Sequence, residues 1–266
     1  MRYGLDLPNF GDFADLSLIA EIAATAEASG WDGVFLWDHI GRSTRFPPGL
    51  PFADVTVALT VIAQATERIT FGPLVTPLPR RRVQKVAREF TSLDHLSGGR
   101  VVLGVGIGSP PDAEFEAFGE DGDLRRRGDL LDEALELLSA FWSGEPVDFD
   151  GEHLSVHTEG FAPPPLQQPR IPLWIGARWP SKGRTLRRAA RWDGIVPTTH
   201  PDSGSDQLTP DEVADIARAM GGGEVVVTAA LGLDPGPYEE AGATWWAEVC
   251  ADRGAALKRA AESPPR

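Results

Sequence analysis

Cysteine and histidine are scarce in this chain of 266 residues, which contains one cysteine, Cys250, and five histidines. A single cysteine excludes an intramolecular disulfide and any multi-cysteine metal site, and the histidines do not follow His-Glu-x-x-His or a similar ligand spacing. No apolar run approaches the length of a membrane span, and the first residues, MRYGLDLPNF, lack the basic and apolar regions of a signal peptide. We therefore expect a cytoplasmic protein that binds no metal and no membrane.

Basic residues are also few, because 25 Lys and Arg against 39 Asp and Glu give a formal net charge of −14. A nucleic-acid-binding protein usually has the opposite balance or a dominant basic face, so we expect no nucleic-acid partner. The remaining composition, with 42% hydrophobic and 24% charged residues, is that of an ordinary globular protein. A concentrated basic segment in such an acidic chain needs an explanation of its own.

Short apolar segments alternate with segments of helical periodicity along nearly the whole chain. The expected strands are residues 3–7, 34–37, 69–75, 101–105, 173–175, 194–197, 224–231 and 244–249. Their apolar runs are continuous rather than alternating, which is typical of parallel sheets covered on both faces. This pattern predicts a single domain over residues 1–266 folded as a closed (β/α)₈ TIM barrel, with an open doubly wound sheet as the alternative.

Two segments depart from the regular alternation. The third expected strand contains Gly72-Pro73, and because proline removes a ladder hydrogen bond we expect a bulge or bend there. After the fourth strand, an insertion over residues 110–170 contains a helix over 124–142 and a hairpin that turns at Asp150-Gly151.

The pair Asp38-His39 follows the apolar strand in WDGVFLWDHI. A buried strand does not easily continue through adjacent Asp and His, since each would need a partner once out of water. The pair therefore marks the carboxyl end of the strand, where barrel enzymes build their active sites, and His39 is the strongest acid/base candidate. The alternative is structural: Asp38 caps the next segment and His39 is a solvated loop residue.

The segments that follow the other strands complete the expected active face. They contain no G-x-S-x-G nucleophile motif and few metal ligands, but many small, apolar and aromatic groups. Such a lining suits a flat organic cofactor better than a hydrolytic triad. Candidates for the substrate pocket are Phe10, Phe46, Trp179 and His200.

Two further segments are candidates for cofactor binding. The run GVGIGS, from Gly104 to Ser109, lacks the spacing of a dinucleotide fingerprint; its glycines let the backbone pass close to a planar ligand, or form a tight bend at the barrel rim. The segment 176–191 is rich in Lys and Arg, and Ser181 at a helix start beside Lys182 predicts an anion site. The alternative there is a solvated basic helix face. A second basic run, residues 80–82, is expected as the exposed start of the third helix.

An ordered set of stretches resembles the luciferase-like family of flavin- and deazaflavin-dependent oxidoreductases. The set includes WDGVFLWDHI, ITFGPLVTP, TSLDHLSGGRVVLGVGIGSPPDAEFEAFG, PRIPLWIGARWPSKGRTLRRAARWDGIVPT and AGATWWAE, and it spans nearly the whole chain. The resemblance implies a (β/α)₈ barrel with an insertion after strand four.

The resemblance also implies roles for individual residues. His39 would handle a proton near the cofactor ring, with Asp38 beside it. Cofactor-binding roles are implied for Pro73, Leu74, Thr76, Gly106, Ile107, Gly108, Ser109, Gly176, Ala177, Arg178, Ser181, Lys182 and Gly183. Within this set the segment from Gly176 to Gly183 would take the cofactor phosphate. Ser109 before two prolines departs from the bulkier residues often found at that position in the family.

The expected function is hydride transfer to or from a small organic substrate, or its monooxygenation, with reduced deazaflavin (coenzyme F-420) or FMN. The resemblance further implies a homodimer and, for oxygen chemistry, a separate flavin or deazaflavin reductase. Two alternatives are a phosphate-binding barrel isomerase or aldolase and a non-catalytic flavin-binding member of the family.

Overall fold

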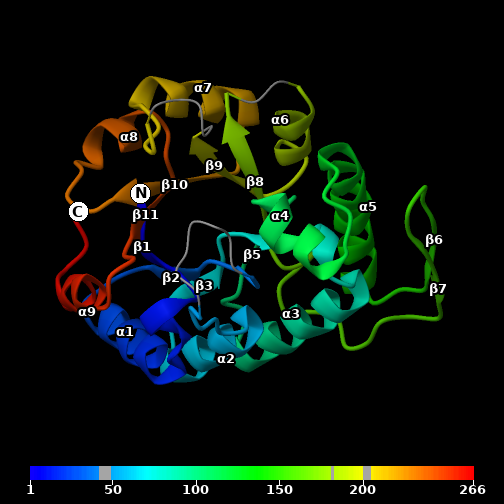
Figure 1. Ribbon diagram of the computed structural model, residues 1–266, viewed down its shortest axis with the longest axis horizontal. Helices are drawn as coiled ribbons and strands as arrows, with labels where there is room; N and C mark the ends of the chain where they lie inside the picture. Colours follow the sequence, from blue (N-terminus) through cyan, green and yellow to red (C-terminus); the bar gives the residue numbers. More distant parts are fainter. Residues whose placement is uncertain (42–48, 181–182, 200–204) are drawn as a thin grey trace.

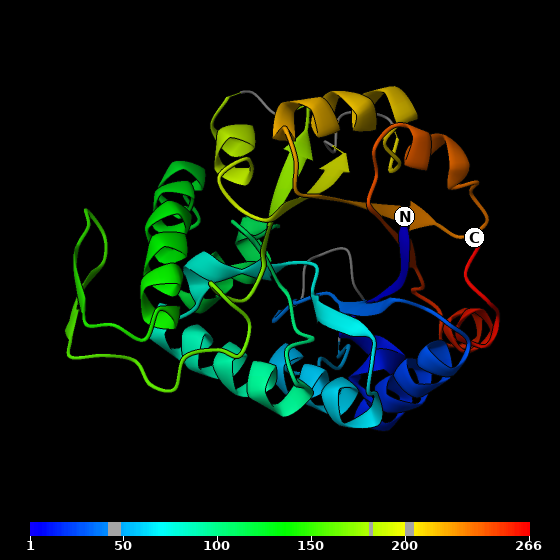
Figure 2. The ribbon, with the colours of Figure 1, turned by 180° about the vertical axis from the view of Figure 1, so that it is seen from behind.

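A ring of parallel strands surrounded by helices forms the body of the protein, as the computed structural model shows for residues 1–41, 49–180, 183–199 and 205–266 (Figures 1 and 2). The strands are β1 Arg2–Leu7, β2 Gly33–Leu36, β3 Thr70–Pro73, β4 Thr76–Pro77, β5 Leu103–Gly106, β8 Leu173–Trp179, β9 Gly194–Thr199, β10 Glu224–Ala230 and β11 Trp245–Val249. Their order is β3-β2-β1-β11-β10-β9-β8-β5-β4.

The barrel closes between its third and fourth strand positions. There β3 pairs with β2, and β4 pairs with β5. An isolated parallel bridge between Phe71 and Val101 joins β3 to the segment that leads into β5. The predicted TIM barrel is therefore confirmed, and the open sheet is wrong.

The interruption of the third strand lies one step later than predicted. Gly72 and Pro73 remain in register with Phe35 and Leu36 of β2, so they do not form the break. The ladder is interrupted at Leu74-Val75, a cis peptide, after which β4 continues along β5. Pro73 fits because β3 pairs in a regular ladder with β2 alone, so its missing N–H leaves that ladder intact.

Helices cover the outside of the ring. They are α1 Leu16–Ala28, α2 Val55–Ala65, α3 Val83–Ser97, α5 Leu124–Trp142, α6 Arg184–Ala189, α7 Pro210–Met220, α8 Gly236–Glu240 and α9 Arg253–Ala261. Local signals set their ends: Asp123 accepts a hydrogen bond from Arg126 N at the start of α5, and Gly98 ends α3 with φ 68°. None of the helices described is long and apolar enough to cross a membrane.

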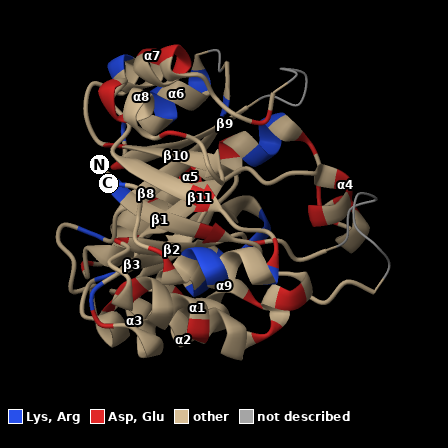
Figure 3. Ribbon diagram, turned by 90° about the vertical axis from the view of Figure 1, so that its left-hand side faces the viewer, with Lys and Arg blue, Asp and Glu red and all other residues tan. Residues whose placement is uncertain are grey.

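The segment between β5 and β8 contains the expected helix and hairpin. It holds α4 Pro111–Glu114, the 3₁₀ turn η3 Glu116–Phe118, α5 and the antiparallel strands β6 Val147–Asp150 and β7 Ser155–Thr158. The hairpin projects away from the ring in Figures 1 and 2. In the side view of Figure 3, α4 lies beyond one end of the strands, which is their carboxyl end because α4 follows β5. The proposed boundaries of the insertion, 110–170, stay a prediction.

Two apolar cores divide the inside from the outside of the barrel. The larger packs the helices on the outer strand faces, and the smaller fills the interior with Phe35, Leu74, Val102, Trp174, Val196, Val226, Trp245 and Ala247. Trp174 and Trp245 are almost fully buried, and their ring centroids lie 5.7 Å apart. Because the interior is filled by side chains, the fold offers a ligand its place at the carboxyl ends of the strands.

Candidate active site

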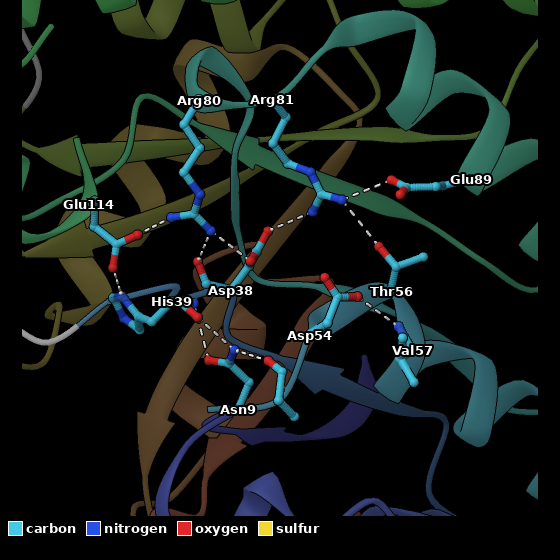
Figure 4. Close-up of polar contacts among 11 residues, drawn as sticks. Asn9, Asp38, His39, Asp54, Thr56, Val57, Arg80, Arg81, Glu89 and Glu114 are labelled. Carbon is cyan, nitrogen blue, oxygen red and sulfur yellow. Dashed lines mark hydrogen bonds and ion pairs between the residues drawn. The ribbon is translucent and has the colours of Figure 1, made fainter. Parts of the chain in front are cut away.

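His39 is held at the end of β2 by hydrogen bonds to its backbone. The side chain of the fully buried Asn9 donates to His39 O at 2.8 Å and accepts from His39 N at 3.1 Å. Asn9 also donates to Ala53 O at 2.8 Å, which joins the ends of β1 and β2 to the segment before α2 (Figure 4). The position of the imidazole is therefore fixed by elements that are far apart in the sequence.

The imidazole of His39 belongs to a set of buried charges that we call the His39 network: Asp38, His39, Arg80, Arg81 and Glu114. His39 Nδ1 lies 2.8 Å from Glu114 Oε1. Arg80 binds the other Glu114 oxygen and also donates to Asp38 Oδ1 at 2.7 Å and to Asp38 O at 2.9 Å. Arg81 lies 3.2 Å from Asp38 Oδ2 (Figure 4). Each carboxylate of the network is thus paired with a guanidinium.

The environment of His39 favours its neutral form. Burial lowers the pKa of His39, and the positive charge of Arg80 lowers it further, whereas Asp38 raises it. The side chain is 25% exposed, against 1% for Glu114 and 5% for Arg80. A neutral imidazole that retains solvent contact can accept a proton near neutral pH.

Aromatic side chains surround His39 at the mouth of the barrel. The Phe10 ring lies 6.0 Å from that of His39 and 5.8 Å from that of Trp37, and Phe52 packs on Phe10 at 5.5 Å. Phe10 therefore lies where the sequence placed it, whereas Phe46 and His200 fall outside the described residues. Trp179 is the last residue of β8 and is partly buried.

A cleft of about 480 Å³ opens beside the network. Its lining includes His39, Phe52, Arg80, Glu114 and Phe118. Acid, base and apolar groups thus meet in one opening of the size used for small-molecule sites.

Glycines of neighbouring strands form a flat wall against Val75. A Cβ added at Gly106 would lie 2.9 Å from Val75 Cγ2, and one added at Gly176 would lie 3.0 Å from it. At Gly104 the added atom would lie 2.2 Å from Pro73 O. These glycines make room for the β3–β4 segment, so close backbone passage, which the sequence suggested for a ligand, first serves packing within the protein.

Arginine side chains from two other elements bind the loop after β5. Arg127 of α5 donates to Ile107 O at 2.9 Å and to Gly108 O at 2.8 Å. Arg178 of β8 donates to Ser109 Oγ at 2.6 Å. The predicted residues of the 106–109 run and Arg178 therefore do come together.

The helix expected over 181–191 is shorter. It is α6, Arg184–Ala189, with Gly183 as its N-cap residue at φ 74° and no side-chain cap. Ser181 and Lys182 fall outside the described residues. Arg184 and Arg188 both bind Asp132 of α5, so these two basic residues attach the helix to its neighbour. Their arrangement agrees with a structural explanation of the basic helix face.

Sequence reasoning missed several members of the site. Glu114 lies in a segment without a recognised motif, and residues 80 and 81 were expected to be exposed, whereas their side chains are 5% and 16% exposed. Asp6 is 2% exposed on β1, accepts a hydrogen bond from Trp37 Nε1 at 3.0 Å, and has no partner for Oδ1. Burial raises the pKa of Asp6 to about 8. An acid inside the apolar run YGLDL was the available signal.

Comparison with known families decides the relationship. A family model described as luciferase-like monooxygenase matches residues 5–233. The chain belongs to the luciferase-like monooxygenase family. The resemblance drawn from the sequence is thereby confirmed.

Curated relatives of this family member include F420-dependent glucose-6-phosphate dehydrogenases. That of Gordonia bronchialis is 32% identical over 183 residues, which are 68% of this chain and 52% of the relative. That of Nocardia farcinica is 31% identical over 205 residues, 76% of this chain and 59% of the relative. The chain thus spans little more than half the length of these relatives.

Solved structures share the fold at low sequence identity. An F420-dependent secondary alcohol dehydrogenase in complex with an F420-acetone adduct has a TM-score of 0.78 at 17% identity, over 98% of each chain. The oxygenating constituent of 3,6-diketocamphane monooxygenase of Pseudomonas putida, in complex with FMN, has a TM-score of 0.65 at 17% identity, over 92% of this chain and 64% of that one. These likenesses support the barrel architecture.

Proposed function

We propose that the protein is an oxidoreductase that transfers hydride between a deazaflavin or flavin cofactor and a small alcohol or its carbonyl product. The observation that carries the proposal is the neutral His39, bound through Nδ1 to Glu114 and partly exposed beside the cleft. Two F420-dependent dehydrogenase relatives and the family's Asp-His pair favour coenzyme F-420 over FMN. Monooxygenation with FMN is the second form of this activity.

The residues present fit such a cofactor. Thr76 is fully buried and its hydroxyl has no hydrogen-bond partner, and Arg127 Nε is likewise buried without one. The flat wall at Gly106 and Gly176 offers a surface for a planar ring. We assign the ring to Pro73, Leu74, Thr76 and the 106–109 loop, and the phosphate end to residues 176–178 with Ser181, Lys182 and Gly183.

The cofactor, when bound, would accept or donate hydride at its ring. In the oxidation of an alcohol, the C–H bond loses hydride and the O–H proton must go to a base as the C=O bond forms. His39 would take that proton, because its pKa is held low enough for the neutral form to be present. In the reverse direction the protonated His39 would return it to the carbonyl oxygen.

Glu114 and Arg80 would hold His39 for this task. Glu114 accepts a hydrogen bond from the protonated Nδ1, which puts the basic lone pair on Nε2. Arg80 balances the charge of both Glu114 and Asp38, so the carboxylates do not draw the imidazole into its charged form. Asp38, expected from the sequence to orient His39, would act through Arg80.

Further expectations accompany this function. The protein would act in the cytoplasm on a small-molecule substrate as a homodimer, and the FMN form would need a separate reductase. Family membership leaves the isomerase or aldolase alternative without support, whereas a non-catalytic cofactor-binding protein remains an outcome of the experiment.

Titration of the purified protein with coenzyme F-420 and with FMN, oxidised and reduced, tests the cofactor. Tight binding of the deazaflavin with weaker FMN supports hydride transfer, preference for reduced FMN supports oxygen chemistry, and binding of neither contradicts the proposal. Binding without turnover across alcohols and carbonyl compounds would indicate the non-catalytic alternative.

The His39→Ala variant tests the acid/base role. We expect cofactor affinity to stay within about tenfold and turnover to fall by about 10²–10⁴, as for the loss of a general acid/base. His157→Ala, on the exposed β6–β7 hairpin, is the matched control and should change neither value. Unchanged turnover in His39→Ala would remove this residue from the mechanism.

A further inference from the structure

Arg127 is a buried cation without a carboxylate partner. It is 3% exposed, and its guanidinium lies 4.6 Å from the centre of the Phe115 ring. Its only hydrogen bonds to the described residues run from Nη1 to the carbonyls of Ile107 and Gly108, and buried Nε has no partner. Burying an ion without a counter-charge is costly, so the arrangement calls for an anion.

Arg100, at the opposite end of the barrel, shows what a structurally satisfied arginine looks like in this protein. It too forms no ion pair with the described residues, but Nε donates to Ser97 O, Nη1 to Thr66 Oγ1 and Ile69 O, and Nη2 to Ala63 O and Thr66 O. Each of its nitrogens is used. On Arg127, by contrast, Nε and Nη2 donate to no described residue. Arg127 is therefore not explained by carbonyl binding alone.

A second guanidinium approaches the same loop. The exposed Arg178 binds Ser109 Oγ and, like Arg127, forms no ion pair among the described residues. Burial lowers the pKa of Arg127, and the charge of Arg178 lowers it further, while Asp123, Asp121 and Glu116 raise it. Those acids are engaged elsewhere or exposed: Asp121 pairs with Arg126 at 3.4 Å, and Asp123 caps α5.

We propose that Arg127 is the buried counter-charge of a phosphate group bound at the 107–109 loop, with Arg178 as its exposed partner. The proposal rests on the proposed function insofar as the phosphate is that of the cofactor, since both FMN and coenzyme F-420 carry one. A phosphorylated substrate is the other source of the same chemistry. Guanidinium groups bind phosphate through charge-assisted hydrogen bonds, and burial strengthens them.

The chain supplies a matched pair of variants for the test. Arg127→Met removes the buried charge while keeping an apolar side chain of similar length against Phe115. Arg126→Met removes the neighbouring charge on the same helix, whose side chain is 59% exposed and pairs with Asp121. Thermal unfolding and circular dichroism of both variants establish that each is folded before binding is measured.

Calorimetric titration with FMN and with riboflavin, which lacks the phosphate, is the decisive comparison. We expect Arg127→Met to weaken FMN by about 10- to 100-fold, the range for one hydrogen bond to a charged group, and riboflavin by less than about threefold. Arg126→Met should change neither ligand. Equal losses for FMN and riboflavin in Arg127→Met would overturn the proposal and leave this residue a structural support of the loop.

Separate arms distinguish the source of the phosphate and the failure of the cofactor assignment. Coenzyme F-420 against its phosphate-free deazaflavin chromophore repeats the comparison for the second cofactor. If the site serves the substrate, Arg127→Met should leave the FMN-to-riboflavin ratio unchanged but weaken glucose 6-phosphate relative to glucose. If the native protein binds neither flavin nor deazaflavin, the proposed function fails, and inorganic phosphate then tests Arg127 alone by thermal shift: loss of stabilisation in Arg127→Met supports the site, and equal shifts contradict it.

Discussion

The His39 network and the loop after β5 treat charge in opposite ways. In the network, Arg80 lies between Asp38 and Glu114, and Arg81 lies between Asp38 and Glu89, so every buried ion has a partner of opposite sign. At the loop, Arg127 and Arg178 bind only carbonyl and hydroxyl oxygens. One region is electrostatically complete without a ligand, whereas the other has positive charge in excess.

The difference separates two kinds of functional group. A base must keep the same protonation state before and after a ligand arrives, and a closed set of ion pairs around His39 provides that constancy. A binding site gains affinity when charge that is unbalanced in the free protein becomes balanced in the complex. The paired region therefore suits proton transfer, and the unpaired region suits anion recognition.

The largest effect should come from breaking the paired region. Arg80→Met leaves Asp38 and Glu114 buried without their shared cation, so we expect the free energy of unfolding to fall by about 3–5 kcal/mol. Arg127→Met leaves no acid unpaired and should change it by less than about 1 kcal/mol. Urea unfolding at neutral pH measures both. Similar losses in the two variants would contradict the distinction between the regions.

Asp6 extends the comparison to an acid that lacks a cation. Its pKa is about 8 in the folded protein and 3.8 in the reference state, so between these values the folded state binds more protons than the unfolded chain. The free energy of unfolding should therefore fall as the pH rises from about 4 to 8, with a contribution of up to about 1.4 kcal/mol per pH unit.

The Asp6→Asn variant isolates that contribution, because asparagine keeps the shape and does not titrate. Its stability relative to the native protein should rise steadily between pH 5 and pH 8, as measured by urea unfolding at several pH values. Parallel pH profiles for the two proteins would show that Asp6 keeps an ordinary pKa.

Sequence reasoning recovered the barrel because its signals are local and repeated. Periodicity placed the α5 helix at its observed ends, and the Asp-His pair identified the carboxyl end of β2. The partner of His39 could not be found in this way, since Glu114 is brought to the imidazole by the path of the chain after β5. Arg80 shows the same limit: a run of three arginines reads as exposed until two buried acids from other segments are known.

The smallest effect concerns the exposed half of the cationic loop and sharpens the contrast within it. Arg178 is exposed, so water and salt screen its charge, and Arg178→Met should weaken FMN by only about two- to fivefold. That loss should shrink further as the salt concentration rises from 50 to 500 mM in the titration, because the Debye length falls to a few Å. The loss in Arg127→Met should persist over the same range, since a charge buried beneath the loop is screened far less. If both losses vanish together with salt, the two arginines act as one diffuse positive field. If the loss in Arg127→Met remains, the buried arginine contacts the phosphate directly and the exposed one only adds to the local potential.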